Sequence, residues 1–174
     1  MINLGGGVIS DIGGFSANTF NRGIDFVNIP TTLLSIVDAS VGGKTGINQN
    51  GIKNKIGTIY DPKLVIIDTD YLETLDQRQI NSGYCEIFKH SLISKENSKF
   101  EYLTDCNEID FSLDIIINSI NIKNNFVVED KYEEKLRKGL NFGHTIGHAI
   151  ETHFMSSDKK LLHGEAIAIG IIIE

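Results

Sequence analysis

The chain has 174 residues, of which 41% are hydrophobic and 22% charged, a balance that suits one globular domain or two small ones. Its formal net charge of −7 disfavours a nucleic-acid-binding protein, and its two cysteines, Cys85 and Cys106, form neither a CxxC pair nor a disulfide framework. The sequence shows no signal peptide, and its last apolar run, AIAIGIIIE, is too short to cross a bilayer. These features predict a cytoplasmic protein that binds neither nucleic acid nor membrane.

The first 72 residues alternate short apolar runs with glycine-rich turns. INL leads into GGG, and the apolar spacing of VISDIGGFSANTF predicts a helix. DFVNIP predicts a buried strand, TTLLSIVDAS a short helix, and VGGKTGINQNGIKNKIG a loop that can hold short hairpin strands. KLVIID is the clearest strand, an unbroken apolar run of the kind buried in parallel sheets. This order predicts an α/β nucleotide-binding layer over residues 1–72.

From Leu75 onward the pattern is helical almost to the end of the chain. Helices are predicted around 76–93 and 112–128, then over LRKGLNFGHTIGHAIETHF and HGEAIAIGIII, while HFMSSDKK reads as a loop. Residues 73–174 are therefore expected to form an all-α domain, with a ligand in a cleft between the two halves. The abrupt start before GGG and the helical pattern still running at the end lead us to expect the middle of a longer protein.

Two stretches of the first half have features of an anion-binding surface. In GGGVISD, glycines after a strand let backbone amides at a helix N-terminus bind phosphate, although Ser10 stands where the third glycine of GxGxxG would be. A plain tight turn explains the same residues. One glycine-rich loop contains Lys44, Lys53 and Lys55 within about a dozen consecutive residues. The point charges of these lysines suit phosphate or carboxylate. A solvated charged loop is the alternative.

The stretch LNFGHTIGHAIE places His144 and His148 four residues apart, the spacing at which one helix face presents two metal ligands. Gly143 and Gly147 each precede a histidine. Because glycine costs a helix interior about 1 kcal/mol against alanine, two of them indicate close approach by another group.

A metal site needs three protein ligands and an open position, so further donors are required. His163 stands in HGE at the start of another predicted helix, and Glu86 in SGYCEIFKH is the best acidic partner. Glu86, Lys89 and His90 share one face of their helix. The alternatives are structural histidines and a surface Glu86–Lys89 pair; His153 is expected to be inert.

Taken together, these motifs resemble the 3-dehydroquinate synthases. The matching runs keep the family's order over almost the whole chain: GGGVISDIGGF, RGIDFVNIPTTLLSIVDASVGGKTGIN, KNKIG, SGYCEIFKH, LRKGLNFGHTIGHAIE and LHGEA. The resemblance implies a fold of α/β followed by all-α, here a partial Rossmann-like NAD-binding layer and a helical domain for metal and substrate. It also implies NAD and a divalent metal, zinc or cobalt, as cofactors, and a homodimer.

Carried over by motif, the metal would be held by Glu86, His144 and His163. His148 would then be a site residue near the substrate, not the ligand that its spacing suggests. The positions that face NAD would be Gly6, Gly7, Asp11, Thr31, Thr32, Leu34, Asp38, Lys53, Thr74 and Leu75. The positions that face the substrate would be Arg22, Lys44, Lys53, Asn54, Lys89, Lys123, Arg137 and Asn141.

The resemblance implies a phosphate-releasing lyase of the shikimate pathway, which converts DAHP, a keto sugar acid phosphate, into 3-dehydroquinate. The steps would be transient oxidation by NAD, β-elimination of phosphate, re-reduction and intramolecular aldol closure, with His148 as the protein group expected to take part in proton transfer. A related sugar phosphate cyclase or a metal-dependent polyol dehydrogenase is one alternative. A non-catalytic remnant that serves as a folding or dimer module is another.

Overall fold

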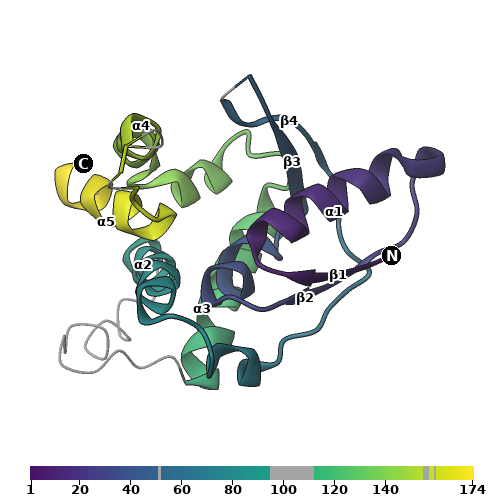
Figure 1. Ribbon diagram of the computed structural model, residues 1–174, viewed down its shortest axis with the longest axis horizontal. Coiled ribbons are helices and arrows are strands. Elements are labelled where there is room, and N and C mark those ends of the chain that lie inside the picture. Colours follow the sequence, from purple (N-terminus) through teal and green to yellow (C-terminus); the bar gives the residue numbers. More distant parts are fainter. Residues whose placement is uncertain (51, 95–111, 155–156, 159) are drawn as a thin grey trace. The chain divides into compact units, whose positions relative to one another are not determined.

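The computed structural model describes residues 1–50, 52–94, 112–154, 157–158 and 160–174. The chain forms two compact units, Met1–Leu75 and Asp76–Glu174 (Figure 1). The division falls close to the predicted change of composition near residue 72. Cys106 and part of the predicted loop HFMSSDKK lie outside the described residues.

The first unit contains a three-stranded parallel sheet in the order β1 (Ile2–Gly5), β2 (Val27–Pro30) and β5 (Leu64–Val65). Helix α1 (Gly7–Thr19) follows β1 and packs closely on the sheet. The contact is so close that a Cβ on Gly13 would lie 2.5 Å from the side-chain nitrogen Nδ2 of Asn3. Asn3 in turn donates to the Oδ1 of its register partner Asn28 at 2.9 Å, and both side chains are buried. The amide pair is thereby satisfied beneath the helix.

The glycine-rich segment after β2 is more regular than the sequence predicts. Lys44–Gln49 (β3) and Ile52–Ile59 (β4) pair as an antiparallel hairpin, with a register shift between Ile47 and Gln49. Gly46 faces Gly57 in the register, and a Cβ on Gly57 would collide with the backbone oxygen of Thr45. The glycines therefore permit close approach of two strands, which the composition alone does not distinguish from a loop.

The predicted short helix over TTLLSIVDAS is present, but its second half, Ser35–Ala39, is wound as a π-helix. Short 3-10 turns at Phe20–Arg22 and Thr69–Leu72 complete the unit. Arg22 has a φ of 65°, an uncommon left-handed conformation for a residue other than glycine.

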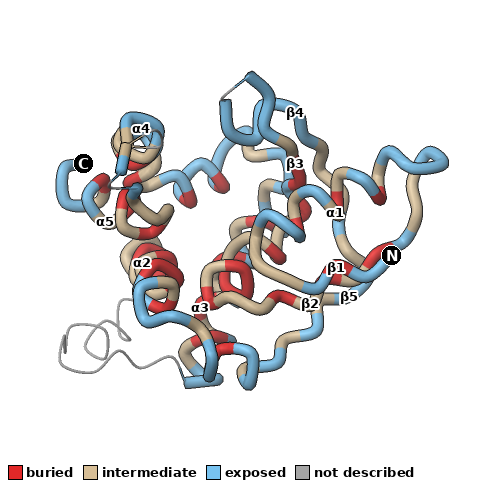
Figure 2. The backbone as a smooth tube through the Cα atoms, viewed as in Figure 1, coloured by how far each residue is buried: buried red, intermediate tan, exposed pale blue. Residues whose placement is uncertain are grey.

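The prediction of a buried strand over KLVIID is wrong in extent and in burial. Only Leu64–Val65 pair with β2, and the residues Leu64 and Ile66 are 53% and 43% exposed. Figure 2 colours each residue of the backbone by its burial. The reason is position: among the described residues β5 is an edge strand, with a partner on one side. An apolar run indicates a strand, but burial depends on what packs over it.

The second unit is helical, as predicted, with α2 (Gln77–Ile93), α3 (Leu113–Glu129), a 3-10 segment (Leu136–Asn141), α4 (His144–Phe154) and α5 (His163–Ile173). The run LRKGLNFGHTIGHAIETHF is divided by Gly143, whose φ of 77° ends the 3-10 segment before α4 begins. His153 and Phe154 belong to α4 and not to a loop. In the described part of the chain, no helix has the length and apolar character needed to cross a membrane.

Glycines set the contact between α4 and α5. A Cβ on Gly147 would lie 2.7 Å from the side chain of Ile167, and one on Gly170 would collide with the backbone oxygen of Gly143 and lie 2.9 Å from the backbone nitrogen of Gly147. The group that approaches the glycines next to the histidines is therefore helix α5 itself, which begins at His163.

Candidate metal centre

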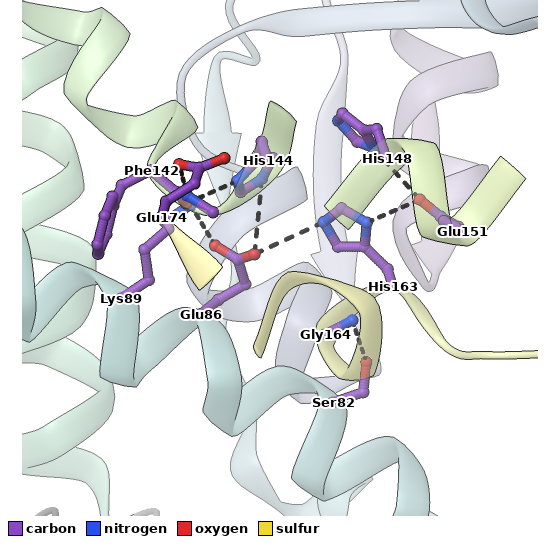
Figure 3. A network of polar contacts seen from close by, with 11 residues as sticks. Ser82, Glu86, Lys89, Phe142, His144, His148, Glu151, His163, Gly164 and Glu174 are labelled. Atoms are coloured by element: carbon purple, nitrogen blue, oxygen red, sulfur yellow. Dashed lines mark hydrogen bonds and ion pairs between the residues drawn. The ribbon is translucent and has the colours of Figure 1, made fainter. Parts of the chain in front are cut away.

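Three side chains from three helices of the second unit converge on one point (Figure 3). The Nε2 atoms of His144 and His163 lie 3.7 and 3.5 Å from the same oxygen, Oε1 of Glu86. One donor atom from each of the three residues lies within 4.8 Å of the others. Glu86 is fully buried, while the side chains of His144 and His163 are only 14% and 16% exposed. A carboxylate and two imidazoles form a donor set that suits a divalent cation such as zinc.

His163 reaches this point because α5 begins directly against α2. The backbone NH of Gly164 donates to Ser82 Oγ at 3.0 Å, one turn of α2 before Glu86. A Cβ on Gly164 would collide with the backbone carbonyl of Ser82 and lie 2.6 Å from its carbon. The glycine in HGE is thus a requirement of close helix contact.

A second link between the two helices is the bidentate pair of Arg78 and Glu165. Arg78 donates from Nε and Nη2 to the two carboxylate oxygens at 2.6 and 2.7 Å, and Glu165 also accepts from the backbone NH of Leu162 at 2.8 Å. The hydrogen bond from Arg78 lowers the pKa of Glu165. These contacts hold the first turn of α5 beside the start of α2.

His144 is held in the orientation that a ligand needs. Its Nδ1 lies 3.1 Å from the backbone oxygen of Phe142, which can only accept, so Nδ1 carries the proton and Nε2 presents a lone pair. Burial, together with the charge of Lys89, lowers the pKa of His144 to about 4. The imidazole is therefore neutral near pH 7, the form that binds metals.

The start of α4 is fixed by Glu174, whose carboxylate accepts from the backbone NH groups of Gly143 at 2.8 Å and Ile146 at 3.3 Å. The hydrogen bond from Gly143 lowers the pKa of Glu174. A carboxylate at a helix N-terminus satisfies amides that have no partner within the helix.

Lys89 forms an ion pair with Oε2 of Glu86, and both side chains are buried. The alternative of a surface Glu–Lys pair is therefore wrong. The pair leaves Oε1 as the oxygen that faces the two imidazoles. The neighbouring Cys85 is a thiol at neutral pH, since burial, and then the charge of Glu86, raises its pKa to about 11.

A second group, His148, Glu151 and His163, also has donor atoms within 4.8 Å of one another. Here the close ring atoms are the two Nδ1 atoms, at 3.3 and 3.2 Å from Oε2 of Glu151. These are hydrogen-bond distances to an acceptor, and His148 is half exposed. The full burial of Glu86, and the backbone acceptor that fixes the tautomer of His144, favour Glu86, His144 and His163 as the donor set.

The other predicted residues of the second unit lie on α3 and in the 3-10 segment Leu136–Asn141. Lys123 on α3 is buried, as is Arg137, which donates to the backbone oxygen of Lys131 at 2.6 Å. Asn141 is exposed and donates to Glu133 at 3.0 Å. Their contact with a substrate stays a prediction.

In the first unit, the predicted NAD-facing segments meet where β1 and β2 end. The backbone NH of Thr31 donates to the oxygen of Gly5, a Cβ on Gly6 would lie 3.2 Å from Thr32, and a Cβ on Gly7 would lie 3.2 Å from Ala39, next to Asp38. Carboxyl ends of parallel strands are where α/β sheets bind ligands. Lys44, Lys53 and Asn54 are exposed on the hairpin of β3 and β4. The remaining predicted positions are Asp11 on α1, Arg22 after α1, Leu34 before the π-helix, and Thr74 and Leu75 after the last 3-10 turn.

The sequence reasoning missed the residues that hold these groups in place. Asp130 accepts from the backbone NH groups of Glu134, Lys135 and Arg137 at 3.0, 2.7 and 3.0 Å and so shapes the loop that carries Arg137. Desolvation raises the pKa of Asp130, but the hydrogen bonds from the three backbone amides outweigh it, so the pKa lies below its ordinary value of 3.8. No pattern in the sequence indicates this loop. For Glu151 a signal does exist, because a spacing of three residues from His148 places both side chains on one face of a helix.

We expect Asp130→Asn to destabilise the chain in a pH-dependent way, because an amide offers one acceptor oxygen where the carboxylate offers two. The pKa of Asp130 is lower in the folded chain than its value of about 3.8 in the unfolded chain, so the carboxylate stabilises the fold at pH values above 3.8. This stabilisation is lost as the pH falls through the pKa of the folded chain. The difference from the parent in urea unfolding should therefore be largest above pH 4 and shrink in acid. Asp158→Asn, at an exposed site, is the control; an equal loss in both variants would contradict the expectation.

Comparisons with known proteins agree in pointing to one family. Two family models match the chain, described as 3-dehydroquinate synthase N-terminal over residues 1–82 and C-terminal over residues 83–174. The chain is 50% identical to a 3-dehydroquinate synthase of Parabacteroides distasonis, over 100% of the chain and 50% of that protein. It thus spans about half the length of the curated relatives it matches.

Two solved structures are similar over 98% of the chain and 48% of their own. One is a 2-deoxy-scyllo-inosose synthase complexed with carbaglucose-6-phosphate, NAD+ and Co2+, with a TM-score of 0.87 and 36% identity. The other is the 2-epi-5-epi-valiolone synthase of Streptomyces hygroscopicus with NAD+ and Zn2+ bound, with a TM-score of 0.80 and 31% identity. Both similarities extend over α/β and helical parts alike.

Proposed function

The chain belongs to the 3-dehydroquinate synthase family, and we propose that the protein of which it forms about half converts DAHP into 3-dehydroquinate and phosphate. The observation that carries the proposal is the convergence of Glu86, His144 and His163 on one point. The relatives at 50% identity favour this substrate over those of the sugar phosphate cyclases at 31% and 36%.

The donor set fits a divalent metal, since the Nε2 atoms of both histidines face one carboxylate oxygen and catalytic zinc sites use three protein ligands of these kinds. We assign Glu86, His144 and His163 as its ligands. A bound metal would supply Lewis-acid polarisation of a substrate oxygen, and bound NAD would supply a hydride acceptor for the alcohol that carries it. The turn at Gly6 and Gly7, with Thr31, Thr32 and Asp38 around it, is the proposed NAD-binding region.

Cationic side chains of this chain would bind the two anionic groups of the substrate. Lys89, Lys123 and Arg137 are buried although the protein is acidic overall. Buried cations attract carboxylate and phosphate more strongly than solvated ones, because less water screens them. His148, half exposed beside His163, is the proposed group for proton transfer. We also keep the predictions that the protein is a homodimer and that it is cytoplasmic.

Phosphate release from DAHP, measured with NAD and zinc or cobalt on the whole protein and on this chain, tests the proposal. We expect stoichiometric phosphate and 3-dehydroquinate with no net NADH from the whole protein. A polyol dehydrogenase would instead accumulate NADH in proportion to product, and a related cyclase would leave DAHP unchanged. Either result would refute the proposed reaction.

A further inference from the structure

Glu151, a residue for which the family resemblance suggested no role, lies between two histidines of different helices. Its Oε2 atom is 3.2 Å from Nδ1 of His163 on α5 and 3.3 Å from Nδ1 of His148 on its own helix α4 (Figure 3). The carboxylate is largely buried, with 14% of its side chain exposed. The rings of His148 and His163 are 5.6 Å apart, so a single carboxylate oxygen serves both.

An ionised carboxylate can only accept hydrogen bonds, so each Nδ1 atom that contacts it must carry a proton. A neutral imidazole has one N–H, and its other nitrogen then presents a lone pair. For His163 that nitrogen is Nε2, which lies 3.5 Å from Oε1 of Glu86. Glu151 thus selects the tautomer in which His163 can bind a metal at the predicted centre.

The same argument applies to His148. With its Nδ1 proton donated to Glu151, its Nε2 is left as the nitrogen that can accept a proton. His144 needs no such partner, because the backbone oxygen of Phe142 fixes its tautomer.

We propose that Glu151 is a positioning residue that sets the Nδ1–H tautomer of both His163 and His148, joining a metal ligand to the proton-transfer residue through one oxygen. This inference rests on the proposed function only in assigning a metal to Glu86, His144 and His163. Acceptors of this kind orient ligand histidines and raise their basicity, and their loss lowers metal affinity roughly 10- to 100-fold.

The first measurement requires no substitution in the acceptor. The chain is labelled with ¹⁵N-histidine, and two-bond ¹⁵N–¹H spectra at pH 8 report which ring nitrogen of each histidine carries the proton. The variants His148→Gln and His163→Gln assign the signals. We expect Nδ1–H at both residues, whereas a free imidazole favours Nε2–H. Detection of Nε2–H at His163 in the parent chain would overturn the proposal without any reference to catalysis.

The second measurement compares Glu151→Leu and Glu151→Gln with Thr152→Ala, an exposed site on the same helix. Leucine removes the acceptor, so His163 and His148 should change to Nε2–H, and zinc affinity, measured by chelator competition, should fall about 10- to 100-fold. Glutamine keeps one acceptor oxygen, which can take the position of Oε2 and serve both rings, so both histidines should keep Nδ1–H in this variant. Thr152→Ala should match the parent.

Zinc affinity and tautomers equal to the control in Glu151→Leu would overturn the proposal. If Glu151→Leu does not fold, as judged by its thermal melt, the tautomers of the parent chain and the glutamine variant decide the matter. Failure of the proposed function is distinguishable, because it would appear as missing phosphate release from the whole protein while the tautomers stay as expected.

Discussion

Replacing Glu86 with glutamine is expected to abolish near-stoichiometric zinc binding by the chain. The carboxylate supplies both the negative charge and the oxygen that both Nε2 atoms face at 3.5 and 3.7 Å, and a neutral amide is a much weaker ligand for zinc. Zinc content after dialysis, measured by atomic absorption, provides the test. Glu129→Gln, an exposed glutamate at the end of α3, should retain the metal.

The same substitution should also destabilise the fold, since it leaves the buried ammonium of Lys89 without its carboxylate. Removing one partner of a buried ion pair costs roughly 3–5 kcal/mol in the free energy of unfolding. The double variant Glu86→Gln/Lys89→Met separates the two effects, because an apolar side chain of similar length removes the stranded charge. We expect it to recover stability in urea without recovering zinc.

His148→Ala decides between the two groups of donors at this site. If Glu86, His144 and His163 hold the metal, this variant retains zinc and loses turnover in the whole protein. If zinc disappears from His148→Ala while Glu86→Gln keeps it, the metal belongs to His148, Glu151 and His163, and the proposed centre is wrong.

Gly164→Ala is expected to cost about 3 kcal/mol of unfolding free energy, at the upper end of the range for overpacking. The added Cβ would collide with the carbonyl of Ser82 and lie 2.6 Å from its carbon, and backbone atoms of a helix cannot rotate away as a side chain does. Helix α5 would have to separate from α2. Urea unfolding and zinc affinity should both fall, because His163 precedes this glycine and its ring would leave Glu86.

Gly139→Ala is the matched control. Its Cβ would meet only the ring edge of Phe126, at 3.3 Å, and the residue is exposed. If both alanine variants lose stability equally, the loss does not come from the contact between Gly164 and Ser82, and this prediction is wrong. A stable Gly164→Ala that has lost zinc would show that α5 shifts without unfolding, which still agrees with a role for the glycine in placing His163.

Local patterns predicted most helices and strands of the fold. Apolar spacing placed α1, α2 and α3 correctly because a helix buries one face, whatever it packs against. The same reasoning failed for KLVIID, because exposure of Leu64 depends on neighbours that the run itself does not specify. For β3 and β4 the glycines indicated a loop that can hold short hairpin strands, and the hairpin is present over the whole of Lys44–Gln49 and Ile52–Ile59.

The candidate site was harder to predict by local spacing than by resemblance. His144 and His148 have the spacing of two ligands on one helix, yet Nε2 of His144 faces Glu86 while Nδ1 of His148 faces Glu151. Spacing reports which residues share a face but not how each ring is rotated, which depends on its hydrogen-bond partners. The motif resemblance proposed Glu86, His144 and His163, and the structure brings these three together; metal binding by them stays a prediction.

By itself the sequence determined the chemical groups of this protein: a carboxylate and histidines in glycine-flanked helical motifs, a strand–glycine–helix turn, and lysines in an acidic chain. Only the tertiary structure decided which nitrogen of each histidine faces the candidate metal and which residues hold it there. Those choices depend on contacts between residues far apart in the chain, such as Ser82 with Gly164 and Arg78 with Glu165. Helix packing creates such contacts, and no periodicity within a single segment encodes them.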